Sequence, residues 1–505
     1  MITIIFTLLF ISTLSQETQK CGDNIEWNFN ETTQTLTITG EGPMYNFEPR
    51  ELPWNEYQMK TKSISISEGI TTIGHNSFAS FQQVTQVKLP STVTFIGNNS
   101  FAYCISLDNV RLPYQIQELG HSAFFGCFEL KSIEVPASLK VIPESAFSCC
   151  AALETVILHD GLEEIGNEAF DNDVMLKTII IPQTVKKVGY MAFAYSTSLE
   201  TVSIGRSVED IGEKTFFECT SISSFIVETI NNHYTSVDGV LFNKDKTELI
   251  AYPVYSSMKE YTIPNTVKTI TYAAFLKTSF LSTVVIPDSV TTIGNEAFKG
   301  GIRLKSVTVG KGIKEIPVAA FRECRLLQTV TLPETITIIR SNAFKSCFML
   351  KEITLPNSLI EIENYAFLEC NNLQTITFGN SLTTIRKSAF AECDKLLSVV
   401  LPTSVKTIED HAFGYCDVLY SVEFNGTEEP TECSENAFAE SNYMLMVKVT
   451  ENYKKDTFCG LKVSTGSPVP PPPKPTETSS QNNEDNGCFS LFSTILLCLI
   501  LVILF

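Results

Sequence analysis

The sequence predicts a repeat solenoid that is mainly β, with one short strand in each coil and short helical or irregular turns between the strands. Two observations predict this fold. A phenylalanine recurs every 23 residues through most of the 505-residue chain, and apolar residues follow it at fixed distances. A period this strict is typical of stacked units that bury one continuous core. The repeat phenylalanines are Phe78, Phe101, Phe124, Phe147, Phe170, Phe193, Phe216, Phe275, Phe298, Phe321, Phe344, Phe367, Phe390, Phe413 and Phe438.

The spacing within the repeat divides each coil into a strand and turns. Apolar residues lie nine and eleven positions after the phenylalanine, as Val87 and Leu89 do after Phe78. This alternation has the period of a β-strand, and a proline often follows at position twelve, where a strand can end. Further apolar residues recur at positions six, fifteen and eighteen. We therefore expect each coil to turn around a narrow apolar centre.

The ends of the array are expected to be capped, because a terminal coil would otherwise expose its apolar cross-section. Residues 25–29 and 35–39 alternate like a hairpin, and Trp27, Tyr45 and Trp54 are suitable covering side chains. The predicted organisation of the array is an N-terminal cap at 16–60, repeats at 61–227 and 261–450, an expanded coil at 228–260 and a C-terminal cap at 451–463.

The expanded coil separates the strand positions Val227 and Ile263 by 36 residues instead of 23. It is expected to contain a β-hairpin, with residues 240–242 and 248–252 on either side of a polar turn. The alternative is a calcium loop, because Asn243, Asp245 and Thr247 alternate as ligands would. However, Glu248 stands where such a loop needs glycine.

The repeat resembles the BspA-like, treponemal-type leucine-rich repeat. The segments 350–356 (LKEITLP) and 373–378 (LQTITF) show the shared pattern, and the similarity covers about residues 61–450. Cys21-Gly22-Asp23, Pro53-Trp54 and the expanded coil also resemble segments of this family. The resemblance implies a right-handed leucine-rich-repeat array. It also implies a secreted or surface-anchored adhesin or antigen with no catalytic residues.

Both ends of the chain have the composition of targeting segments. Residues 1–15 resemble a secretory signal peptide, with a buried N-terminal strand as the alternative. Residues 464–487 are a polar, Pro-rich segment that is expected to form an extended stalk. Residues 488–505 are uncharged and long enough for a single transmembrane span. The alternative is a GPI-type signal processed near Ser479 and Ser480. Both alternatives predict a plasma-membrane protein whose ectodomain is extracellular.

Charge and motif content exclude several classes of function. The 37 basic and 56 acidic residues leave a net charge of −19, which disfavours nucleic-acid binding. The five histidines do not converge on one site, and the sequence has no C-x-x-C, G-x-S-x-G, phosphate-loop or H-E-x-x-H motif. We therefore expect no catalytic residues, no metal and no cofactor.

A column of cysteines lies three positions after the repeat phenylalanines. In-register side chains point in parallel, so free buried thiols are expected, with disulfides between neighbouring coils or a metal ladder as alternatives. Cys21, Cys433 and Cys459, in or near the caps, are better disulfide candidates. The column consists of Cys104, Cys127, Cys150, Cys219, Cys324, Cys347, Cys370, Cys393 and Cys416.

The outward strand positions, eight and ten after each phenylalanine, are rich in serine and threonine. Ile157, Ile180, Ile226 and Val285 interrupt this surface with an aliphatic stripe, which we predict to be the partner-binding site. The alternative is that these residues only reflect the β-propensity of branched side chains. Three glycosylation sequons begin at Asn30, Asn98 and Asn425, and they are relevant only in a eukaryotic host.

Together these features predict a cell-surface adhesin or antigen that binds proteins or glycans on host or neighbouring cells. Binding is expected to use the extended repeat surface, without catalysis. The alternative is a lectin-like or peptide-binding receptor that acts with a co-receptor.

Overall fold

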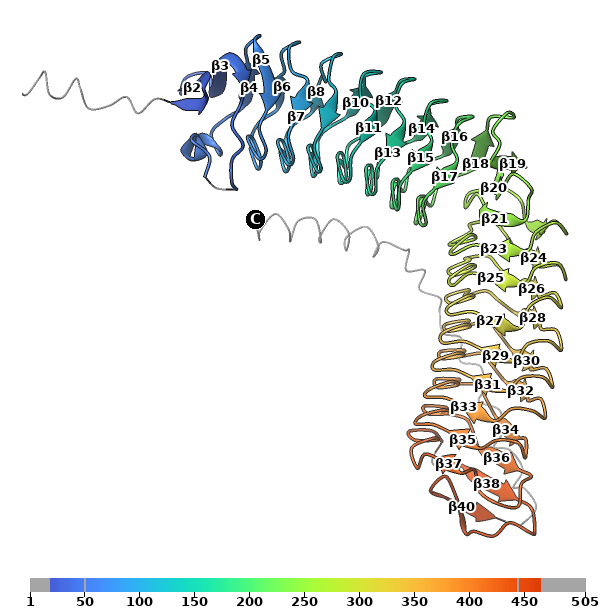
Figure 1. Ribbon diagram of the computed structural model, residues 1–505. Helices are drawn as coiled ribbons and strands as arrows, with labels where there is room; N and C mark the ends of the chain where they lie inside the picture. The colour runs from blue at the N-terminus through green and yellow to red at the C-terminus, as the bar shows by residue number, and fades with distance from the viewer. Residues whose placement is uncertain (1–18, 50, 443–444, 465–505) are drawn as a thin grey trace, which may run out of the picture. The chain divides into compact units, whose positions relative to one another are not determined.

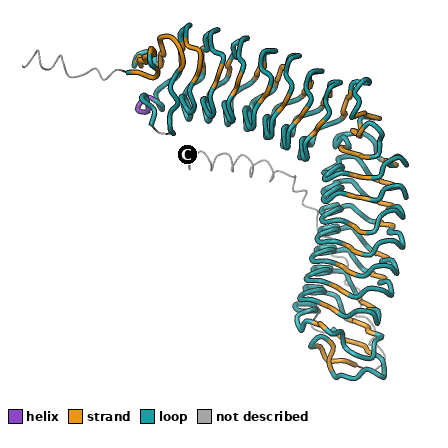
Figure 2. The backbone as a smooth tube through the Cα atoms, in the orientation of Figure 1, coloured by secondary structure: helices purple, strands orange, loops and turns teal. Residues whose placement is uncertain are grey.

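The computed structural model describes residues 19–49, 51–442 and 445–464, and it confirms the predicted β-solenoid (Figure 1). Short strands alternate with longer turns in every coil (Figure 2), and the one helical element among these residues is η1 (Asn55–Tyr57). The described chain divides into two units. The first comprises residues up to 221 together with 227–232, and the second comprises 222–226 and 233–464. The predicted signal peptide, stalk and terminal segment lie outside the described residues, except Ser464.

The first unit begins with a hairpin that caps the array. Three strands, β1 (Lys20–Gly22), β2 (Asn24–Asn30) and β3 (Thr35–Pro43), precede η1. Strands β2 and β3 are antiparallel, whereas β3 pairs in parallel with the first repeat strands. The fully buried Trp54 stacks on Phe78 at 5.4 Å between ring centroids, and its indole N–H donates to the carbonyl of Ser77. The cap therefore continues the core over the end of the first coil.

The strand predicted nine to eleven residues after each phenylalanine forms what we call the major ladder. Its strands are parallel and in register where they pair, so that Ile133 lies opposite Val156. The inward residues are buried, as Ile179 and Ile181 are. In the first unit the major ladder comprises β4 (Ser63–Ile66), β6 (Gln86–Lys88), β8 (Asn109–Val110), β10 (Ser132–Val135), β12 (Thr155–Leu158), β14 (Thr178–Ile181) and β16 (Thr201–Ile204).

The sequence predicts one strand per coil, but the structure contains a second strand in each coil. These second strands form what we call the minor ladder. Most of these strands have only two residues, too few to produce a recognisable alternation in the sequence. Their pairing is again parallel, for example between Ile142 and Ile165. The minor ladder of the first unit comprises β5 (Ile70–Ile73), β7 (Phe95–Ile96), β9 (Glu118–Leu119), β11 (Val141–Ile142), β13 (Glu164–Ile165), β15 (Lys187–Val188) and β17 (Asp210–Ile211).

The turn that contains the repeat phenylalanine is ordered by stacking and by backbone hydrogen bonds between coils. From Phe78 to Phe216, neighbouring rings stack at centroid distances of 5.2 to 6.0 Å. Residues two before and two after the phenylalanine are left-handed, as at Asn99 (φ 53°) and Tyr103 (φ 58°). Their N–H groups donate to the next coil, from Tyr103 to the carbonyl of Phe125 at 2.7 Å. These bonds offset the cost of the left-handed conformation, about 1–2 kcal/mol per residue.

The second unit starts with the expanded coil. Strands β19 (Tyr234–Val237), β20 (Val240–Asn243) and β21 (Glu248–Ala251) are antiparallel, and β21 continues in parallel into the minor ladder. The predicted hairpin corresponds to β20 and β21. The Asn243 carboxamide closes its turn by accepting from the N–H groups of Thr247 and Glu248. The strand β18 (Ser224–Val227) precedes this hairpin.

The two ladders and the phenylalanine stack recur in the second unit, where rings from Phe275 to Phe438 lie 4.7 to 5.4 Å apart. The major ladder comprises β22 (Glu260–Thr262), β24 (Thr283–Val285), β26 (Ser306–Thr308), β28 (Thr329–Thr331), β30 (Glu352–Thr354), β32 (Thr375–Thr377), β34 (Ser398–Leu401), β36 (Ser421–Phe424) and β38 (Met446–Val449). The minor ladder comprises β23 (Thr269–Ile270), β25 (Thr292–Ile293), β27 (Glu315–Ile316), β29 (Ile338–Ile339), β31 (Glu361–Ile362), β33 (Thr384–Ile385), β35 (Thr407–Ile408) and β37 (Glu432–Cys433). The described chain ends in the hairpin β39 (Thr457–Phe458) and β40 (Leu461–Ser464).

Candidate functional site on the major ladder

The outward side of the major ladder holds the residues that the sequence predicts to bind a partner. Ile157 on β12 and Ile180 on β14 are 46% and 68% exposed, although isoleucine is usually buried. They lie on consecutive coils whose strands are in contact. Ile157 is opposite Glu134, and Ile180 is opposite Ser203. The pair is therefore a small apolar area flanked by polar side chains.

The other two predicted residues belong to the second unit and differ in exposure. Ile226 is 52% exposed. Val285, at the end of β24, is less exposed, since it is half-buried, and it lies opposite Thr308. Val400 on β34 occupies the same outward position, is 51% exposed and lies opposite Glu423. The sequence analysis did not single out Val400, although its position in the repeat is the signal that could have identified it.

The nine cysteines of the thiol column are buried and free in the structure. Each thiol donates to the carbonyl of the phenylalanine one coil earlier, at 3.0 to 3.6 Å between sulfur and oxygen. Burial raises the pKa of Cys104, Cys324 and Cys370 to about 12, so these thiols stay protonated. Since a thiolate is the nucleophile and the metal ligand, the arrangement of the column suits a structural role.

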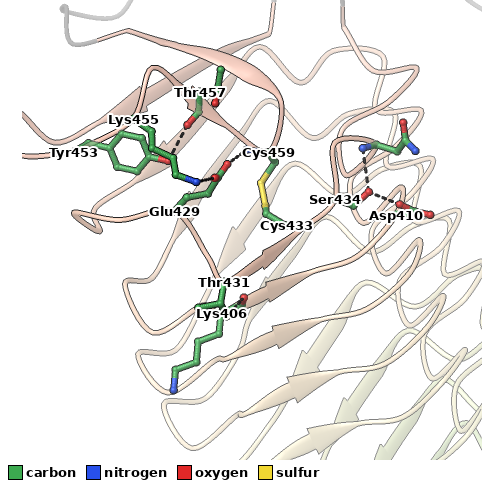
Figure 3. Close-up of a disulfide and its surroundings, with 11 residues drawn as sticks. Lys406, Asp410, Glu429, Thr431, Cys433, Ser434, Tyr453, Lys455, Thr457 and Cys459 are labelled. Carbon is green, nitrogen blue, oxygen red and sulfur yellow. Dashed lines mark hydrogen bonds and ion pairs between the residues drawn. A yellow bond between two sulfur atoms is a disulfide. The ribbon is translucent and has the colours of Figure 1, made fainter.

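Two of the three cap cysteines form a disulfide. Cys433 on β37 is bonded to Cys459 after β39, with 5.2 Å between their Cα atoms (Figure 3). Beside it, Glu429 accepts from the ammonium group of Lys455 and from the N–H of Cys459, at 2.6 Å each (Figure 3). These contacts join the last repeat to the terminal hairpin.

The expectation that Cys21 is a disulfide candidate is not met. Cys21, on β1, is a free, fully buried thiol, and burial raises its pKa to about 12. Its side chain fills space inside the N-terminal cap as a small apolar residue does.

The three sequon asparagines differ in their surroundings. Asn30 is exposed, and its side-chain oxygen accepts from the N–H groups of Thr32 and Thr33 at the end of the β2–β3 hairpin. Asn425 is also exposed. Asn98 is half-buried, and its side-chain oxygen accepts from the N–H of His121 at 3.0 Å. Asn30 and Asn425 are therefore the more accessible positions.

No group of three or more His, Cys, Asp or Glu side chains in 19–49, 51–442 and 445–464 is arranged to hold a metal ion. In the same part of the chain, no helix has the length and apolar character needed to cross a membrane. The outward side of the major ladder presents hydroxyl, charged and aliphatic side chains, which can bind by hydrogen bonding and apolar contact.

Comparison with known proteins identifies the repeat. The model of the "BspA type Leucine rich repeat region (6 copies)" matches residues 56–175, 163–254, 251–367 and 337–459. No curated protein matches the chain significantly.

Three solved structures resemble this chain over most of their own length. A leucine-rich cell surface protein from Faecalibacterium prausnitzii is 26% identical with a TM-score of 0.54; the match covers 72% of this chain and 95% of that one. A leucine-rich repeat protein from Bacteroides ovatus is 20% identical with a TM-score of 0.49, and the match covers 85% and 99% of the two chains. The pneumococcal vaccine antigen PcpA is 21% identical with a TM-score of 0.45, with 86% and 94% covered. Because the family model spans most of the sequence, the chain belongs to the BspA-type leucine-rich repeat family.

Proposed function

We propose that this protein is a cell-surface adhesin or antigen that binds host or neighbouring cells through the outward side of its major ladder, without catalysis. The observation that carries the proposal is the exposed pair Ile157 and Ile180 on consecutive coils. Exposed contiguous apolar surface with a polar rim is typical of protein-binding sites. The similar protein from Faecalibacterium prausnitzii is described as a cell surface protein, which supports the location.

The binding site is tested by placing charge in the apolar pair. Ile157→Asp with Ile180→Asp is expected to abolish binding of the full-length protein to cells. The inward residues Ile179 and Ile181 stay buried, so the melting temperature is expected to change little. The matched control is Thr331→Asp with Thr354→Asp, at equivalent exposed positions of β28 and β30.

Three results would contradict the proposed site. Equal loss of binding in both double variants would show that any added charge on the ladder interferes. Unchanged binding in the isoleucine variant would show that the pair is not used. A large drop in its melting temperature would show that the isoleucines stabilise the sheet instead.

The proposed anchoring depends on the uncharged segment 488–505. Truncation after Gly487 is expected to release the protein into the medium, whereas the full-length chain stays with washed cells. Retention of the truncated protein would contradict this anchor. Release of the full-length form by a phosphatidylinositol-specific phospholipase would identify a GPI anchor in place of a transmembrane span.

A further inference from the structure

A depression with a volume of about 690 Å³ lies on the first unit, over the beginning of the major ladder. Three exposed basic side chains line it: Lys88 at the end of β6, Arg111 after β8 and Lys131 before β10. Lys88 and Arg111 occupy the same position of consecutive coils, and neighbouring strands of a sheet are about 4.8 Å apart. The depression therefore presents a row of cations rather than a single charge.

These cations are unusual for a chain whose net charge is −19. Farther along the first unit, lysines are neutralised by the neighbouring coil: Lys177 pairs with Glu154, and Lys187 pairs with Glu164. By contrast, no carboxylate of the described residues lies within ion-pairing distance of Lys88, Arg111 or Lys131. Asp108 is the one acidic residue in the lining, so the lining residues together have a charge of +2.

The other lining side chains indicate what kind of anion fits. Gln86 and Asn109 lie opposite each other on β6 and β8 and expose their amides. Three serines complete the polar lining, namely Ser63, Ser65 and Ser132. Amide and hydroxyl groups both donate and accept hydrogen bonds, as the hydroxyl groups of a sugar require.

Two features argue against a peptide as the ligand. Strand β6 pairs with β4 on one edge and with β8 on the other, and at the far edge of β8 the N–H of Lys131 in the next coil donates to the carbonyl of Asp108. This surface therefore offers no free strand edge to which a peptide strand could add. The apolar lining residues, Ile64 and Val87, are buried beneath the sheet and leave no pocket for an apolar side chain. Apart from the half-buried Asp108, the accessible side chains that line the depression are thus polar or cationic.

We propose that this depression binds an acidic polysaccharide. Its sulfate or carboxylate groups would contact Lys88, Arg111 and Lys131, and its sugar hydroxyl groups would contact Gln86 and Asn109. The inference rests on the proposed function, since it names a ligand class that the protein would meet outside the cell. It uses a surface separate from Ile157 and Ile180.

Binding is measured with detergent-extracted full-length protein on immobilised heparin, which is sulfated, hyaluronate, which is carboxylated, and neutral dextran. Binding to either acidic polysaccharide but not to dextran is the expected result, and the comparison identifies the preferred anion. Raising the salt from about 0.15 M to about 1 M shortens the screening length from about 8 Å to about 3 Å, so binding should fall steeply.

The variant Lys88→Glu with Arg111→Glu is expected to weaken binding by about tenfold or more, because charge-assisted hydrogen bonds are lost. The matched control is Lys305→Glu with Lys351→Glu, which changes the net charge equally on exposed lysines in the repeat position of Lys131. Its affinity should stay within about twofold of the parent protein. Lys88→Gln with Arg111→Gln, checked by melting temperature, provides a variant without introduced negative charge.

Equal weakening by Lys88→Glu with Arg111→Glu and by Lys305→Glu with Lys351→Glu would show a non-specific charge effect and overturn the proposal. Tighter binding of a polyglutamate peptide than of either polysaccharide would replace the glycan with an acidic protein segment. Failure of the parent protein to bind either acidic polysaccharide, while it still binds to cells, would overturn this inference alone. Polysaccharide binding without any binding to cells would contradict the proposed adhesin function and leave this site standing.

Discussion

The carboxylate of Asp173 accepts a hydrogen bond at 2.8 Å from the backbone N–H of Cys150, on the preceding coil. Asp173 occupies the column position that holds cysteine in most coils, and its side chain is fully buried. In the next coil Ser196 donates from this position to the carbonyl of Phe170. The equivalent acceptor for Asp173 would be the carbonyl of Phe147, but the second carboxylate oxygen of Asp173, Oδ2, is buried without a hydrogen-bond partner among the described residues. Burial raises the pKa of Asp173 well above its usual range, in agreement with a protonated acid.

The first prediction is that Asp173 makes the stability of the array depend on pH. An acid whose pKa is raised by folding costs stability as the pH rises above its unfolded value of about 3.9, and the cost grows until the native pKa is reached. Asp173→Ser should therefore raise the melting temperature at pH 8 more than at pH 5. Thermal unfolding at both pH values measures this difference.

The exposed Asp210→Ser is the control for the first prediction, and it should shift both melting temperatures equally. Asp171 contributes in the same direction, because burial raises its pKa to about 8, so Asp173→Ser should reduce the pH dependence without removing it. Parallel pH profiles of the parent protein and Asp173→Ser would show that Asp173 is not the titrating group.

The second prediction concerns the reactivity of the thiol column. In native protein, thiol reagents should leave Cys347 and Cys370 unmodified, because both are fully buried and donate to backbone carbonyls. After denaturation without reduction, most column cysteines should react, whereas Cys433 and Cys459 should not. Mass spectrometry of the labelled peptides distinguishes the two groups. A disulfide between Cys347 and Cys370 would contradict the free column.

The third prediction concerns the N-terminal cap. Trp54→Ala should destabilise the protein by about 3–5 kcal/mol, because a large buried ring that covers the core is removed. It also leaves the carbonyl of Ser77 without its indole donor. Chemical denaturation measures the free energy of unfolding, with the exposed Met59→Ala as the control that should change little. A loss below about 1 kcal/mol would show that the cap does not protect the first coil.

The fourth prediction concerns the disulfide of the C-terminal hairpin. Cys433 and Cys459 are 26 residues apart in sequence, and the bond should contribute about 3 kcal/mol by restricting the unfolded chain. A reducing agent should therefore lower the melting temperature of the parent protein but not that of Cys433→Ser with Cys459→Ser. The buried free thiol variant Cys21→Ser should keep its response to reduction. An identical response of the parent protein and the double serine variant would contradict this role.

The sequence by itself determined the repeat, the major ladder and the inward side chains. Equivalent residues of successive coils occupy equivalent positions in the array. The 23-residue spacing of Phe, Leu, Val and Ile therefore shows directly which side chains pack against each other in the core. The same logic placed Ile157 and Ile180 on the outward side, and it identified the thiol column and the hairpins β2–β3 and β20–β21, but not the C-terminal hairpin β39–β40. These features follow from local alternation and from identical neighbours, and both can be read along the chain.

Only the tertiary structure decided which of these positions have special environments. The left-handed turn residues are as different as Asn99 and Tyr103, because hydrogen bonds to the next coil, and not the side chains, hold the backbone there. Three features depend on side chains that lie about one coil or more away in the sequence: the pairing of Cys433 with Cys459, the raised pKa of Asp173, and the lack of ion-pairing carboxylates near Lys88 and Arg111 among the described residues. Stacking brings such residues together across coils, and their interaction energies therefore exist only once the array has formed.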